Sequence, residues 1–366
     1  MLFNYYDPEQ SLLDGLSKHK LTTDFKIPDV YTQDHRWLAA SSLQKSIRRG
    51  NIREALKAAH ILQRFSSTHL WNRLKVIALE DIGLSDPDIV SQVLFVAGKA
   101  QWRDKHAGDG FILNYLIHQL CASVKCRVLD DALYVANYHY LYAEQRLIYS
   151  GMEEKELHEL FFDENLDTIE RILACWFLSG TKRYPATNLT PRQGNPNIIY
   201  DLANSIGTPQ HMLDLLKLSK AQEYFVCMLP CLMQIEKSET CAVVKETSNA
   251  MQMIGNFPAC SYDRHTRAGK LAFRRFLKSC PTISDFINNN LPKADLLDLV
   301  GWAVFALEGR LLDKRLTFDG SEILLKQAIQ SWMQCQGMSN DLQSDFLNLM
   351  RENMEDLQDA RRSVAR

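Results

Sequence analysis

Apolar residues recur at helical spacing along most of the chain, and long alternating runs typical of strands do not occur. Leu70, Leu74 and Ile77, for example, follow an i, i+4, i+7 pattern. Most such stretches are bounded by Gly, Pro, Ser, Thr or Asn, which favour helix ends. We therefore predict an all-α protein built as a multi-helix orthogonal bundle. The predicted helices cover 36–49, 51–65, 68–82, 87–100, 109–124, 128–149, 153–161, 164–179, 197–206, 209–217, 219–234, 239–253, 266–278, 283–290, 293–309, 320–335 and 339–361.

Residues 180–196 interrupt this helical pattern. The segment holds three prolines and two glycines, which exclude a continuous helix, and it carries Lys182, Arg183 and Arg192 without an acidic residue. A loop of this length is either an interdomain linker or a functional loop. A domain boundary at this loop would divide the chain into two packed helical subdomains. The predicted parts are an N-terminal extension at 1–35, a helical domain at 36–179, the basic loop at 180–196 and a second helical domain at 197–366.

Composition sets limits on function. Apolar residues make up 46% of the 366 residues, enough for a large core, and a net charge of −2 means that any DNA contact must come from local basic patches. The chain has no apolar run of membrane-spanning length and no secretory signal at its start. We expect a cytoplasmic protein, or one in the host cytoplasm if a phage encodes it, without membrane contact. The nine cysteines lack paired CxxC spacing, so we expect reduced thiols and neither a metal ion nor a cofactor.

Two neighbouring predicted helices carry charge at their C-terminal ends. The first ends in Lys45, Arg48 and Arg49, which the helix dipole stabilises by about 0.3–1 kcal/mol each. This cluster is either a well-capped helix end or a phosphate-binding patch. The second helix ends in Glu80-Asp81, where the dipole disfavours anions. The acidic pair therefore needs a partner, such as Arg73 or a basic group on another helix, in a network that is either structural or part of a site.

Residues from about 36 to 136 resemble the helical region that follows the ATPase module in the RarA/MgsA family of replication-associated AAA+ proteins. The matching strings are Leu43-Gln44-Lys45-Ser46-Ile47-Arg48, Glu54-Ala55-Leu56, Arg73, and Ile77-Ala78-Leu79-Glu80-Asp81-Ile82-Gly83-Leu84-Ser85-Asp86-Pro87. The resemblance implies a helical domain that supports oligomerisation and works at stalled replication forks. It does not imply ATP hydrolysis, because the chain contains no G-x-x-x-x-G-K-[ST] motif. The second half of the chain does not resemble this family.

A basic helix at 266–278 is the second charged feature. Thr266 is a suitable N-cap, and Arg267, Lys270, Arg274 and Lys278 then form one stripe. Arg264 and Arg267 lie at the start of this helix, where a phosphate would satisfy both the free N–H groups and the arginines. The stripe is either a solvated face or a phosphate contact. Asp263 and His265 precede it, and their spacing suits either general acid–base work or a structural capping turn.

Three functions fit these features. The first is a DNA-associated helical protein of replication, repair or mobile-element metabolism that contacts phosphates. The second is a transferase that modifies activated bases in DNA, as in phage hypermodification, and the third is a protein-binding scaffold. The expected partners are DNA and, in a homo-oligomer, further copies of the chain. The candidate catalytic residues are Asp263, His265, Glu80 and Asp81. The candidate phosphate-binding residues are Lys45, Arg48, Arg49, Arg73, Lys182, Arg183, Arg192, Arg264, Arg267, Lys270 and Arg274.

Overall fold

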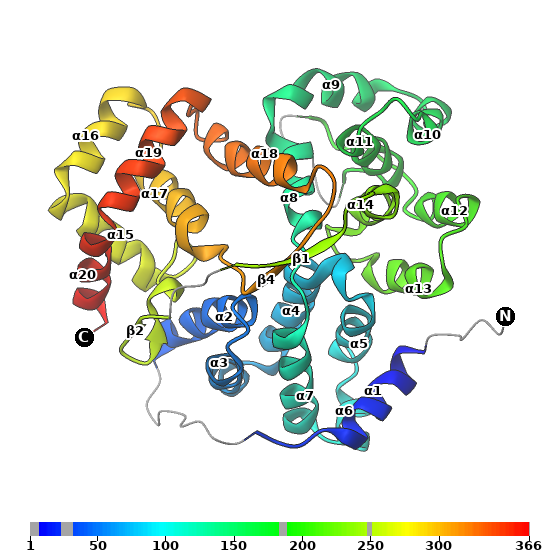
Figure 1. Cartoon of the computed structure of the whole chain (residues 1–366), viewed down its shortest axis with the longest axis horizontal. Helices are drawn as coiled ribbons and strands as arrows, with labels where there is room; N and C mark the ends of the chain where they lie inside the picture. The colour runs from blue at the N-terminus through cyan, green and yellow to red at the C-terminus, as the bar shows by residue number, and fades with distance from the viewer. Residues whose placement is uncertain (1–6, 23–31, 183–188, 247–250, 366) are drawn as a thin grey trace.

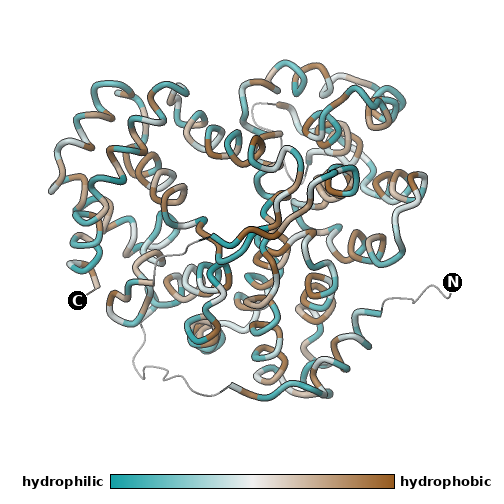
Figure 2. The backbone as a smooth tube through the Cα atoms, viewed as in Figure 1, coloured by the Kyte–Doolittle hydropathy of each residue, from teal (hydrophilic) through white to brown (hydrophobic). Residues whose placement is uncertain are grey.

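The computed structural model describes residues 7–22, 32–182, 189–246 and 251–365, and this part of the chain is mostly helical (Figure 1). The predicted all-α multi-helix fold is therefore confirmed. None of the described helices combines the length and the apolar character that crossing a membrane would require. Hydrophobic and hydrophilic residues alternate along most helices (Figure 2), as expected where one side of a helix packs inward.

The described residues up to Lys237 form fourteen α-helices. These are α1 (Pro8–Lys18), α2 (Gln33–Arg48), α3 (Ile52–Phe65), α4 (Ser67–Ile77), α5 (Pro87–Ala97), α6 (Ala100–His106), α7 (Asp109–Ala122), α8 (Val128–Tyr138), α9 (Ala143–Gly151), α10 (Glu154–Phe162), α11 (Thr168–Ser179), α12 (Ile198–Ser205), α13 (Gln210–Ser219) and α14 (Phe225–Lys237).

The described residues after Lys237 add six α-helices and four short strands. The helices are α15 (Arg267–Ser279), α16 (Pro281–Asn290), α17 (Leu296–Val304), α18 (Ser321–Gln334), α19 (Asn340–Glu352) and α20 (Met354–Val364). The strands are β1 (Ala242–Lys245), β2 (Met253–Ile254), β3 (Phe257–Pro258) and β4 (Lys314–Thr317). β1 pairs antiparallel with β4, and this ribbon crosses the middle of the view in Figure 1.

The helix predicted at 239–253 is wrong. Residues 242–245 form β1, whose Ala-Val-Val-Lys sequence pairs with β4, so a partner strand far away in the chain decided the conformation. The helix predicted at 128–149 ends at Tyr138 and resumes at Ala143, because His139 has extended backbone (φ −67°, ψ 133°). The sequence pattern did not predict α1 and α6.

The apolar core forms one large cluster and one smaller cluster. The large cluster joins buried residues on both sides of 180–196, such as Leu173 and Leu229. The smaller cluster is confined to α15–α20 and contains Phe273, Phe276 and Phe346. The domain division predicted at 180–196 stays a prediction.

Two of the described helices end in a π-helical turn, and the two turns share a sequence. α4 continues into η1 (Ala78–Ile82), and α17 continues into η5 (Phe305–Gly309). Each contains Ala-Leu-Glu, at 78–80 and at 306–308. Hydrogen bonds from Gly83 N–H to the Ala78 carbonyl and from Arg310 N–H to the Phe305 carbonyl give the i to i+5 spacing of a π-helix. Such turns are rare and occur frequently at functional sites.

Candidate active site

The two π-helical turns face a cavity of about 490 Å³. Its walls come from α2, α4 with η1, α8, the turn before α14, the turn before α15, and α17 with η5. A volume of this size lies in the range of small-molecule sites, which is about 300–1,000 Å³. The cavity is the point where segments from the two halves of the sequence meet.

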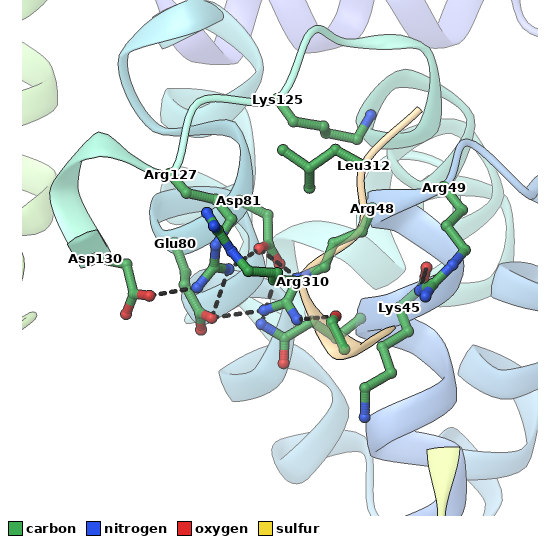
Figure 3. Close-up of polar contacts among 12 residues, drawn as sticks. Lys45, Arg48, Arg49, Glu80, Asp81, Lys125, Arg127, Asp130, Arg310 and Leu312 are labelled. Carbon is green, nitrogen blue, oxygen red and sulfur yellow. Dashed lines mark hydrogen bonds and ion pairs between the residues drawn. The ribbon is translucent and has the colours of Figure 1, made fainter. Parts of the chain in front are cut away.

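Arg48 is the centre of a buried charge network beside the cavity (Figure 3). Its guanidinium donates from Nη2 to Glu80 Oε1 at 2.6 Å, from Nε to Asp81 Oδ1 at 2.7 Å and from Nη1 to the Gly309 carbonyl at 2.7 Å. Arg127 pairs with the same two carboxylates and with Asp130. Arg48 thus connects both π-helical turns, and the acidic pair has the partners that its position at a helix end requires.

Lys45 lies one turn before Arg48 on α2 and forms an ion pair with Asp263. The Ser41 hydroxyl donates to the same Asp263 carboxylate at 2.6 Å. Asp263 also accepts the backbone N–H of His265 at 2.9 Å, which shapes the turn before α15. α2 therefore supplies a cationic partner both to the acidic pair at 80–81 and to the 263–267 turn.

Ion pairing keeps two of the cavity carboxylates ionised. Burial alone would raise the pKa of Glu80, but Arg127 and Arg48 outweigh burial and lower it to about 2. Burial opposes the ionised form of Asp263 as well, and Lys45 and His265 lower its pKa to about 2. These two groups are therefore fixed anions across the neutral pH range.

Two other carboxylates on the cavity wall shift in the opposite direction. Burial raises the pKa of Asp130 to about 8; Arg127 opposes this shift, and Glu80 adds to it. The Tyr224 hydroxyl donates to Asp130 at 3.3 Å. Desolvation and the nearby Glu80 raise the pKa of Glu223, although its side chain remains exposed to solvent. A site that separates the pKa values of its carboxylates in this way can supply both fixed charge and a transferable proton.

Aromatic rings and donors without partners complete the cavity wall. Trp302 is 9% exposed, and its Nε1 has no hydrogen-bond partner among the described residues. The Arg264 guanidinium lies 3.9 Å from the centre of the Trp302 ring, and its Nη1 is likewise buried and unpaired within the described chain. Tyr134 and Tyr138, one turn apart on α8, line the same wall, and the centre of the Tyr134 ring lies 5.7 Å from that of the Trp302 ring. A ligand in the cavity could supply acceptors for these two donors.

The described residues among the predicted phosphate-binding residues occupy four different places. Lys45, Arg48, Arg73 and Arg264 line the cavity, whereas Arg49 donates to the Glu308 carbonyl at 2.5 Å. The side chains of Arg267, Lys270 and Arg274 are exposed on α15. Lys182 and Arg192 line a separate cavity, and Arg183 lies outside the described residues.

The predicted catalytic residues also differ in their surroundings. Glu80, Asp263 and His265 line the cavity, while Asp81 lies behind it with 0% exposure. Burial lowers the pKa of His265. The Asp263 anion raises this pKa, whereas the Arg264 and Lys45 cations lower it further.

Sequence reasoning missed four residues of the site: Arg127, Asp130, Glu223 and Tyr224. Arg127 and Asp130 are spaced i, i+3 at the start of α8, a pattern that predicts only a local surface pair. Glu223 and Tyr224 fall in the turn before α14, in a segment predicted to be helical. The turn places both residues at the cavity, and no sequence motif predicts this placement.

The fold and the cavity define a predominantly helical protein with a cavity lined by charges of both signs, to which both halves of the sequence contribute. No family model, curated protein or solved structure matches this chain.

Proposed function

We propose that the protein is a transferase that acts on an activated base in DNA, with the central cavity as its active site. The observation that carries the proposal is the arrangement of four carboxylates in one cavity, two held ionised and two with raised pKa values. Separation of pKa values within one site is typical of acid–base catalysis. The aromatic wall and the unpaired donors add a place for a planar, anionic substrate.

Each part of the cavity has a role in this reaction. A flipped base would stack on the aromatic wall formed by Tyr134, Tyr138 and Trp302, as bases do in enzymes that work on DNA. Arg73 and Arg264 would bind an anionic leaving group such as pyrophosphate, because both residues line the cavity. The fixed anions Glu80 and Asp263 would keep Arg48 and Lys45 in place.

Glu223 is the proposed general base. An N–H or O–H nucleophile forms the new bond to the substituent on the base with its lone pair, and its proton passes to the Glu223 carboxylate. The bond between this substituent and a pyrophosphate oxygen breaks, and its electron pair leaves with the pyrophosphate anion. Asp130, whose pKa is raised to about 8, has one oxygen against Arg127 and the other against the Tyr224 hydroxyl, and would keep these two groups in place beside the substrate.

The basic face of α15 supports DNA as the carrier of the base. The side chains of Arg267, Lys270, Arg274 and Lys278 are exposed and form no hydrogen bond or ion pair with other described residues. The stripe extends for about 16 Å along the helix and begins two residues after His265, which lines the cavity. A DNA backbone that follows this face would therefore pass the cavity.

The experiment is mass analysis of nucleosides from DNA of cells that express the wild-type protein or variants. Glu223→Gln should lower the yield of a modified nucleoside by a factor of about 10²–10⁴. Glu236→Gln, an exposed carboxylate on α14, is the matched control and should leave the yield unchanged. Nucleosides that are identical with and without the wild-type protein would overturn the transferase.

A non-catalytic DNA-maintenance protein is the second candidate, and the same unpaired face of α15 favours it. The resemblance to the RarA/MgsA family stays a prediction and would support this candidate. In that case the wild-type protein and both variants, Glu223→Gln and Asp130→Asn, should bind DNA, and the nucleoside composition of the DNA should be the same with all three.

A further inference from the structure

A second, smaller cavity of about 210 Å³ adjoins the central one. Its walls come from the end of α11, the described residues 192–196, the turn after α13 and the start of α14. Glu223 lines both cavities. The residues on either side of Glu223 line different cavities: Gln222 lines only the small cavity, and Tyr224 lines only the central one.

Backbone rather than side chains forms one wall of the small cavity. Gly180 has a φ of +91°, and a Cβ atom added there would lie 2.6 Å from the Gly194 nitrogen. The Thr181 N–H donates to the Arg192 carbonyl at 3.0 Å, and the Asn195 N–H donates to the Leu178 carbonyl at 2.9 Å. These contacts fix the two ends of the loop against each other and keep the wall in place.

The charge of the small cavity favours an anion. Lys182, Arg192 and Lys220 line it, and Glu223 is the one acidic residue among its described lining residues. The Lys182 side chain is exposed and forms no hydrogen bond or ion pair with other described residues. Trp176, Phe225 and Val226 provide an apolar wall.

We propose that this small cavity binds the second substrate of the transferase, a small molecule that carries a carboxylate or a phosphate. The anionic group would contact Lys182 and Lys220, and the nucleophilic N–H or O–H group would point toward Glu223 and the central cavity. This inference rests on the proposed function, because a transferase needs two substrates that meet at one general base, here Glu223. It explains why one exposed carboxylate lines both cavities.

The experiment measures thermal stabilisation of the full-length protein by inorganic phosphate and by glutarate, with glutaramide as the uncharged analogue. A ligand that binds only the folded protein raises Tm in a saturable manner. We expect saturation with one or both anions and no shift with glutaramide. The double variant Lys182→Met/Lys220→Met should raise the half-saturating anion concentration by a factor of ten or more.

Lys155→Met, which removes a side chain that is 88% exposed on α10, is the matched control and should retain the shift. Both variants change exposed lysines, so both should fold. The inference is overturned if neither anion gives a saturable shift, or if the double variant and Lys155→Met respond equally.

A second measurement separates this inference from the proposed function. Binding of dTMP to the central cavity should be weakened by Arg73→Met and unaffected by the double lysine variant. Binding of dTMP without anion binding would overturn the second site alone. Anion binding with unchanged nucleosides in the cellular assay would leave the second site and overturn the transferase.

Discussion

Lys45 and Arg48 lie one turn apart on α2 and form ion pairs with two different parts of the wall of the central cavity. Lys45 pairs with Asp263 in the turn before α15, while Arg48 pairs with Glu80 and Asp81 in η1. Neither cation is available to the surrounding solvent, since both residues are less than 5% exposed. One helix thereby fixes the relative position of acidic groups that lie far apart in the sequence.

Arg48→Met should destabilise the fold strongly. The substitution leaves Glu80 and Asp81 with one guanidinium partner fewer in a buried setting and frees the Gly309 carbonyl. Removal of one partner from a buried ion pair costs about 3–5 kcal/mol. Urea denaturation should show this loss, whereas Lys155→Met, which breaks an exposed pair with Glu159, should change the free energy of unfolding by less than about 0.5 kcal/mol.

Gly269→Ala should move α15 away from the cavity. A Cβ atom on Gly269 would lie 2.0 Å from the Asp263 carbonyl oxygen, so the helix could not keep its contact with the preceding turn. We expect a loss of about 1–3 kcal/mol, as found when extra atoms enter a packed interior. Gly110→Ala is the control, because Gly110 is also in a first helical turn but has open space around it.

The control should be neutral or stabilising by up to about 1 kcal/mol, the helix preference of Ala over Gly. Equal effects of the two substitutions would contradict the close packing of α15 on the 263–266 turn. Differential scanning calorimetry of both variants gives the comparison.

The pH dependence of stability should change in Asp130→Asn. The folded pKa of Asp130 is raised from 3.8 to about 8, so its contribution to stability is fully present below pH 3.8 and is lost as the pH rises through about 8. The wild-type free energy of unfolding should therefore contain a component that falls with rising pH in this window, by up to about 1.4 kcal/mol per pH unit.

Asp130→Asn removes the titrating group, so this component should disappear from urea denaturation curves measured between about pH 6 and pH 9. Asp285→Asn changes an exposed carboxylate on α16 and should keep the wild-type slope. A slope in Asp130→Asn that equals the wild-type slope would show that Asp130 is ionised throughout.

The triple variant Arg267→Gln/Lys270→Gln/Arg274→Gln should bind DNA with weaker salt dependence. Removal of each phosphate-binding cation makes the slope of log K against log salt less steep by about 0.9, so the triple variant should differ from wild type by about 2–3. The weakening should be similar for different DNA sequences, because phosphates carry no sequence information. Filter binding at several salt concentrations measures the slope.

Lys155→Gln/Lys217→Gln/Lys237→Gln is the matched triple control, since it also removes three exposed cations, from α10, α13 and α14. The two triple variants have the same net charge. If both lower the slope equally, the basic face of α15 has no special role.

Several features of the site could be predicted from the sequence. The acidic pair Glu80-Asp81 lies at a helix end, where the dipole is unfavourable, and this alone required a cationic partner. The sequence also marks Arg48 as a candidate cation and Asp263 as a candidate acid, and both are at the cavity. Thr266 was predicted as the N-cap of the basic helix, and its hydroxyl accepts the Gly269 N–H at 2.9 Å.

Other features depend on distant contacts. Residues 242–245 became a strand because β4 supplied a partner, although a helix was predicted for 239–253. In the sequence Asp130 is an ordinary acid at a helix start with Arg127 three residues before it, and only the fold buries this pair and adds Glu80 and Tyr224. Glu223 belongs to the site only because the turn before α14 brings it to two cavities.

The sequence by itself determined the all-α fold, because helical periodicity and helix ends depend on residues only a few positions apart. It also determined that the charged helix ends needed partners. The tertiary structure decided which partners those are, which carboxylates are desolvated and where the cavities lie. These properties come from burial and from distances between segments that are remote in the chain, and no local pattern encodes them.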